Sequence, residues 1–186
     1  MTISATTQGI KPGVCTSTNR PANPFDGQVI SETDTDSLKV YNGSSWLSVG
    51  KIIQVVNAVY ATDVLNTTTT YAATGLTATI TPTLSTSKVL VLVNQNVGKH
   101  TGNTDSYAWL QLKRGSTVLS TFYVGPYTAT SMYLLNVSAT TSYLDSPATT
   151  SATTYSTQFK NNVAADGARV QWQNADSTIT LIEVAT

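Results

Sequence analysis

The chain has 186 residues and carries 10 Lys and Arg against 10 Asp and Glu, so its formal net charge is zero. This length fits one domain with at most a small appendage, and the lack of net positive charge disfavours nucleic acid as a partner. Charged residues make up only 11% of the chain, while Ser and Thr fill 53 positions, which favours β-strands over helices.

The first seven residues lack the basic and apolar regions of a signal peptide. Cys15 is the only cysteine, so no internal disulfide can form. The longest apolar run, residues 89–93, is far too short to span a bilayer. We therefore expect synthesis in a cytoplasm, with no membrane insertion.

Residues 1–23 show no sustained periodicity and are rich in Thr, Ser, Gly and Pro, which predicts an extended N-terminal arm. Residues 24–50 contain the turn signals Asp26-Gly27 and Asn42-Gly43. These turns predict a small β-meander, whose strands we expect at 28–33, 38–41 and 46–49. Such a meander is hardly stable alone.

Residues 51–186 are expected to form one β-domain. The spacing of apolar and β-branched residues predicts nine strands, at 52–60, 72–80, 88–97, 107–113, 117–124, 132–139, 153–160, 168–173 and 178–184. That number is close to the eight of a jelly roll. Residues 89–93 are apolar on both faces, which predicts a strand buried on both sides, between two layers or within an assembly. The predicted fold class is thus all-β, an arm and small meander followed by an antiparallel jelly-roll-like sandwich.

One segment carries a family resemblance. Residues 20–46 combine a Pro-rich lead, Gly27-Gln28, Glu32-Thr33-Asp34-Thr35, Val40-Tyr41-Asn42-Gly43 and Trp46. This pattern resembles a short module common in tail-fibre and virion-surface proteins of tailed bacteriophages. Residues 51–186, with a hairpin at 109–115 and a last strand at 179–184, resemble the jelly rolls that follow such modules. The resemblance implies a homotrimer, as in complement-like and tumour-necrosis-factor-like jelly rolls.

The function expected from this resemblance is a non-enzymatic virion structural protein on the outside of a phage particle. The preferred role is a trimeric capsid decoration or short head fibre, whose residues 1–50 attach it to the major capsid protein or a tail protein of the same phage. Seven residues in this region are the predicted attachment contacts: Ile10, Pro12, Pro21, Pro24, Phe25, Tyr41 and Trp46.

The alternative function is a receptor-binding tail-fibre or tail-tip protein that recognises host surface glycans. Its predicted contacts lie in two loops and are His100, Asn103, Asp105 and Tyr127. Tyrosines that could line a sugar-binding face, or instead fill the core and subunit contacts, are Tyr123, Tyr127, Tyr133, Tyr143 and Tyr155.

No catalytic or cofactor site is predicted. His100 is the only histidine, so neither a hydrolase triad nor a zinc site is indicated. A depolymerase would need paired carboxylates in a groove, whereas the ten acidic residues concentrate in turns. Glu32, Asp34 and Asp36 alternate and could cup a hard cation or simply form a turn, which the sequence leaves open.

Overall fold

The computed structural model describes residues 12–99, 107–124, 136–163 and 167–185. The chain divides into two compact units, residues 1–51 and residues 52–186. Both units are built from β-strands, as the sequence predicts. Of the predicted contact residues, Ile10, His100, Asn103, Asp105 and Tyr127 lie outside the described residues, as does Tyr133.

The first unit is a single four-stranded sheet in the order β1-β2-β3-β4. Its strands are β1 (Gly13–Cys15), β2 (Val29–Glu32), β3 (Ser37–Tyr41) and β4 (Trp46–Ser48). The meander prediction is confirmed for β2 to β4, which pair antiparallel. Within the predicted arm, β1 pairs parallel with β2 and becomes part of the sheet.

Asn42 and Gly43 form part of the turn between β3 and β4. The side-chain oxygen of Asn42 accepts hydrogen bonds from the backbone nitrogens of Ser44, at 3.0 Å, and Ser45, at 2.8 Å. Gly43 has φ +85°, a value that side-chain-bearing residues rarely adopt. The Asn-Gly signal in the sequence therefore marks a turn whose geometry requires those residue types.

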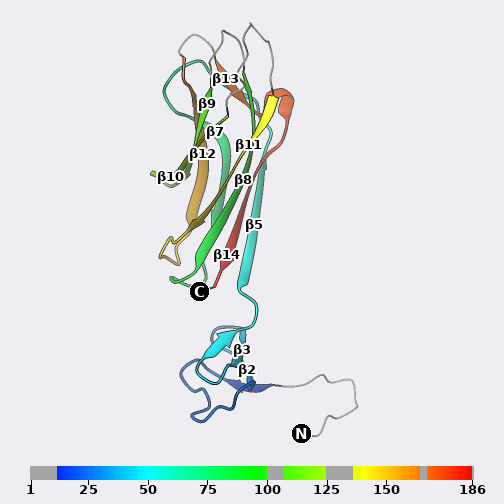
Figure 1. Cartoon of the computed structure of the whole chain (residues 1–186), viewed down its shortest axis with the longest axis vertical. Coiled ribbons are helices and arrows are strands. Elements are labelled where there is room, and N and C mark those ends of the chain that lie inside the picture. The colour runs from blue at the N-terminus through cyan, green and yellow to red at the C-terminus, as the bar shows by residue number, and fades with distance from the viewer. Residues whose placement is uncertain (1–11, 100–106, 125–135, 164–166, 186) are drawn as a thin grey trace, which may run out of the picture. The chain divides into compact units, whose positions relative to one another are not determined.

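The second unit is a sandwich of two antiparallel sheets (Figure 1). The four-stranded sheet has the order β10-β9-β12-β7, with β7 (Ala72–Ile80), β9 (Ala108–Arg114), β10 (Thr117–Val124) and β12 (Thr153–Asn161). The six-stranded sheet is built around β8 (Lys88–Lys99). β11 (Asn136–Asp145) pairs with one edge of β8, and β14 (Ser177–Val184) and β13 (Ala168–Val170) pair along the other. β5 (Ile52–Tyr60) and β6 (Val64–Asn66) complete this sheet.

This strand order is jelly-roll-like, because β7 to β9 and β10 to β13 alternate between the two sheets, while the pairs β9–β10 and β13–β14 each stay within one sheet. Three differences from the predicted strands stand out. β6 was not expected, β11 runs to Asp145 instead of ending at residue 139, and β13 ends at Val170. β13 is short because Gln171, Gln173 and Asn174 have positive φ angles, which end the extended backbone.

The core lies between the two sheets and has a polar layer. One apolar cluster is centred on Leu76, Val91 and Leu181, and the other on Leu110 and Phe159. Between the sheets, the Gln95 side chain donates to Ser177 Oγ at 2.8 Å and accepts from Thr157 Oγ1 at 2.9 Å. Because Ser177 belongs to one sheet and Thr157 to the other, this buried network ties the two layers in one register.

Candidate interaction surfaces

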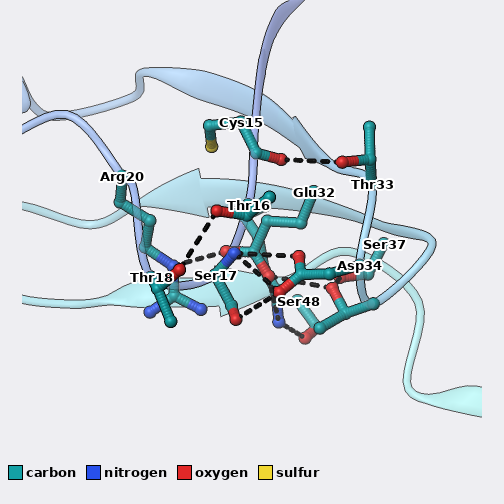
Figure 2. A network of polar contacts seen from close by, with 12 residues as sticks. Cys15, Thr16, Ser17, Thr18, Arg20, Glu32, Thr33, Asp34, Ser37 and Ser48 are labelled. Atoms are coloured by element: carbon teal, nitrogen blue, oxygen red, sulfur yellow. Dashed lines mark hydrogen bonds and ion pairs between the residues drawn. The ribbon is translucent and has the colours of Figure 1, made fainter.

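The first unit is held by a buried charge. Glu32 is fully buried and forms an ion pair with Arg20, whose Nε donates to Oε1. Thr35 Oγ1 donates to Glu32 Oε2 at 2.9 Å, and Lys39 Nζ lies 3.8 Å from the same oxygen (Figure 2). Burial alone would raise the pKa of Glu32, but these hydrogen bonds and charges outweigh burial and hold the pKa below the usual glutamate range.

The second carboxylate of this cluster is also used within the protein. Asp34 accepts hydrogen bonds from the Ser17 backbone nitrogen, at 2.8 and 3.0 Å, and from Ser17 Oγ at 2.5 Å (Figure 2). The Ser17 bonds lower the pKa of Asp34. In the described part of the chain, no three His, Cys, Asp or Glu side chains are placed to hold a metal ion. Glu32 and Asp34 thus fasten residues 16–20 to the sheet.

The sheet of the first unit has an exposed apolar face. Val14, Val29, Leu38 and Leu47 lie on it, and each is between 39% and 57% exposed. Their strand partners place them on the side opposite Ile30 and Glu32. Sequence reasoning did not single out these residues, because the side of the sheet on which each one lies depends on the register of all four strands.

The predicted attachment residues are distributed differently. Phe25 is 69% exposed, whereas Pro12, Pro21 and Pro24 are half-buried. Tyr41 and Trp46 are cross-strand partners with ring centroids 5.3 Å apart. Both rings lie on the same side of the sheet as Ile30 and pack on each other. The structure therefore brings Tyr41 and Trp46 together but places Phe25 outside that pair.

The six-stranded sheet exposes a second apolar surface. Val55, Ile182, Leu90 and Leu144 are mutual neighbours across β5, β14, β8 and β11, and we call them the apolar row. Val55 is 58% exposed and Leu144 is 52% exposed. Ile182 and Leu90, between them in the row, are partly exposed. Single exposed apolar residues are ordinary on proteins, whereas contiguous apolar patches are typical of interaction sites.

The residues on one side of the apolar row are uncharged, and three of the four are polar. The next positions along the same four strands are Asn57, Thr180, Leu92 and Ser142, and Asn57 Nδ2 donates to Thr180 Oγ1 at 2.8 Å. Among the described outward-facing positions of these strands there is no carboxylate, and Lys88 is the one basic residue. A depletion of charge is typical of the core of a protein–protein interface.

The tyrosines proposed for a sugar-binding face are separated by the fold. Tyr155 is fully buried and its hydroxyl donates to Asp145 Oδ2 at 2.7 Å. Its burial and that hydrogen bond raise its pKa. Tyr143 lies on β11 of the six-stranded sheet, whereas Tyr123 lies on β10 of the other sheet and is 63% exposed. Among the described members of this set, Tyr123 is the one that lies beside other aromatic side chains, Tyr107 and Trp109.

Comparison with known proteins gives a fold likeness only. No family model matches the sequence, and no curated protein matches it. Among solved structures, the chain is similar to the infectious bursal disease virus VP2 subviral particle, with a TM-score of 0.38 and 10% identity. It is also similar to structures of the Gx and Gt strains of that virus, with TM-scores of 0.37 and 0.34 and identities of 12% and 10%.

Each of these alignments covers 78% of this chain. The chain spans about four tenths of the length of the viral proteins, 41%, 40% and 42% respectively. The functional assignment therefore depends on the surfaces described above. Within the described residues, no helix is long and apolar enough to cross a membrane.

Proposed function

We propose that this chain is a non-enzymatic structural protein of a phage virion that assembles as a homotrimer through the outer face of its six-stranded sheet. The observation that carries the proposal is the apolar row Val55–Ile182–Leu90–Leu144, on four strands whose described outward positions carry no carboxylate. Burying such a face between copies removes apolar area from water, and Lys88 is the one charged residue at the described outward positions of these strands. The β8 segment 89–93 then becomes covered on both sides, as its sequence predicts.

A second surface serves attachment in this proposal. The apolar face formed by Val14, Val29, Leu38 and Leu47 contacts the major capsid protein or a tail protein of the same particle, in a capsid decoration or short head-fibre role. The Arg20–Glu32 pair and the Ser17–Asp34 bonds hold residues 16–20 against the sheet. The resemblance of residues 20–46 to the phage module supports the same assignment.

Sedimentation velocity of the purified full chain tests the subunit contact. We expect a species of three times the 19.7 kDa chain mass. Val55→Glu combined with Leu144→Glu places charge in the buried row and should yield folded monomers. Val118→Glu is the matched control, because Val118 is 45% exposed on the other sheet. A wild-type monomer, or a double variant that stays trimeric, would contradict the proposed contact.

Particle assembly tests the attachment surface. Deleting residues 1–23 should abolish incorporation, but that deletion also removes β1 and Arg20. The cleaner variant is Val14→Lys with Leu47→Lys, which leaves the Glu32 network intact. We expect this variant to form trimers that are missing from gradient-purified particles when assayed by mass spectrometry. Normal incorporation would refute attachment through this face.

The second candidate function is a receptor-binding tail fibre or tail tip. One observation favours it: on the other sheet of the sandwich, the exposed Tyr123 lies beside the partly buried rings of Trp109 and Tyr107. Adsorption of the purified trimer to host cells, competed by host surface polysaccharide, would favour this role over head decoration.

A further inference from the structure

The outer face of the four-stranded sheet carries a row of three rings and one lysine that runs across the sheet. Tyr123, Trp109 and Lys160 are register neighbours on β10, β9 and β12, and Lys160 Nζ lies 4.9 Å from the centre of the Tyr71 ring beside β7. We call these four residues the aromatic row. The Trp109 and Tyr123 centroids are 5.1 Å apart, and Tyr107 meets Tyr123 edge-on at 6.4 Å.

These rings are not core residues. Outward and inward positions alternate along β9, where Leu110 and Leu112 are fully buried while Trp109 is partly exposed. Tyr123, at 63% exposed, is among the most exposed large apolar side chains of the second unit. The aromatic row is therefore a platform presented to solvent by a rigid sheet.

A row of amides and a hydroxyl lies beside the rings. Gln158 and Gln111 are cross-strand partners, and Gln158 Nε2 donates to Gln111 Oε1 at 2.5 Å. Gln111 Nε2 lies 3.4 Å from Thr121 Oγ1 on β10. Side chains of this kind both donate and accept hydrogen bonds, as the hydroxyl groups of a sugar require. Flat rings next to amides are suited to a ligand with one apolar face and many hydroxyls.

The charge of this face has one sign. Its outward positions on β7, β9, β10 and β12 carry Lys113 and Lys160 and no carboxylate among the described residues. None of the ion pairs in the described part of the chain involves either lysine. Lys113 pairs with Ser156, four residues before Lys160 on β12, which separates the two lysines by about 13 Å along the strand direction.

We propose that this face binds an acidic polysaccharide, with its sugar rings on the aromatic row, its hydroxyls on Gln111 and Gln158, and its carboxylates at Lys113 and Lys160. The amide row suits the hydroxyl groups of a sugar. Single-stranded nucleic acid fits less well, because two lysines offer few contacts to a phosphate backbone. This proposal assigns a ligand class and a binding surface to the second candidate function, receptor binding. It rests on that function only for the biological role of the binding. Binding is measurable on the purified protein whichever particle carries it.

The test uses the full-length protein and calorimetric titration with hexamers of galacturonic acid. The same hexamer with its carboxylates methyl-esterified is the neutral control ligand. Trp109→Ala removes the central ring, and Lys113→Gln with Lys160→Gln removes the charge while keeping the side-chain length similar. Phe25→Ala and Lys51→Gln are matched controls, because they remove an exposed ring and a lysine charge from the first unit and leave the residues of this sheet unchanged.

We expect Trp109→Ala to weaken binding by about tenfold or more, and the double lysine variant to weaken it by about threefold or more and to flatten its dependence on salt. Both control variants should bind like the wild type. The proposal is overturned if the wild type does not bind the acidic hexamer, if the esterified hexamer binds as well, or if oligo-dT binds more tightly. If Trp109→Leu, which keeps an apolar side chain, converts the trimer to monomers, the face is a subunit contact instead. These results leave the test of the apolar row on the other sheet unaffected.

Discussion

Glu183 is expected to hold one end of the sandwich together. It is fully buried on β14, yet it is ionisable. Its carboxylate accepts hydrogen bonds from Gln54 Nε2 at 2.5 Å, from the Thr83 backbone nitrogen at 2.7 Å and from Thr83 Oγ1 at 3.2 Å. The donors belong to β5 and to the loop between β7 and β8, so one side chain connects three segments that are distant in sequence.

Glu183→Ala leaves these donors without their acceptor. A hydrogen bond to a charged group contributes about 1.5–3 kcal/mol, and water entering at the end of the sandwich recovers part of the loss. We therefore expect the free energy of unfolding to fall by about 3–5 kcal/mol. At roughly 2–4 °C per kcal/mol for a chain of this size, the melting temperature should fall by roughly 6–20 °C.

Glu183→Gln removes the charge of the side chain but nearly keeps its shape. Burial raises the pKa of Glu183, but hydrogen bonds from Gln54, Thr83 and Leu84 outweigh it, so the pKa in the folded state is lowered. A lowered pKa adds stability above the unfolded value of about 4.3, and that stability is lost as the pH falls through the folded pKa. The stability deficit of Glu183→Gln should thus be largest near neutral pH and shrink in acid.

Urea unfolding followed by tryptophan fluorescence, at one fixed protein concentration, measures both effects. Trp109 and Trp172 report on the second unit. Asp176→Asn is the control, because it removes an exposed carboxylate just before β14 and should change stability by less than about 0.5 kcal/mol. A Glu183→Ala protein that melts within a degree or two of wild type would refute this reasoning, as would a Glu183→Gln deficit that does not depend on pH.

Three further predictions concern single residues, two through the stability of the fold and one through the pKa of Glu32. Gly75→Ala should lower the free energy of unfolding by more than about 2 kcal/mol, because Gly75 has φ +88° and a Cβ there would lie 2.2 Å from Tyr60 Cε1. Denaturant unfolding measures this loss. If adding Tyr60→Leu recovers no stability, the clash with Tyr60 is not the cause. Tyr155→Phe should cost about 1.5–3 kcal/mol by removing the hydroxyl that donates to Asp145, and an unchanged melting temperature would contradict that estimate. Arg20→Gln should raise the pKa of Glu32 in an NMR titration, because the main partner of that buried carboxylate is lost; an unaltered titration would show that Arg20 does not hold Glu32.

Alternation along single strands was enough to predict most of the second unit. β5, β7, β10 and β14 follow the predicted ranges within one residue at each end. β1 and β6 were missed because three-residue strands carry no measurable period. The end of β13 depends on positive φ angles at Gln171 and Gln173, and glutamine gives no sequence signal for them.

The surfaces were harder to predict because they depend on register. Val55, Ile182, Leu90 and Leu144 lie far apart in sequence and become one row only when four strands are aligned. The same holds for Trp109, Tyr123 and Lys160. Gln95 and Thr157 interrupt apolar patterns, and only the facing sheets show that they satisfy each other.

A cryo-electron-microscopy map of intact virus particles that carry this chain tests the central claim most directly. We expect density for three copies around a three-fold axis, with the apolar row buried between them and the face of Val14, Val29, Leu38 and Leu47 against a capsid or tail protein. Density on the head would establish decoration, and density on the tail would favour receptor binding. Particles without this chain, or single copies with the apolar row exposed, would contradict the account.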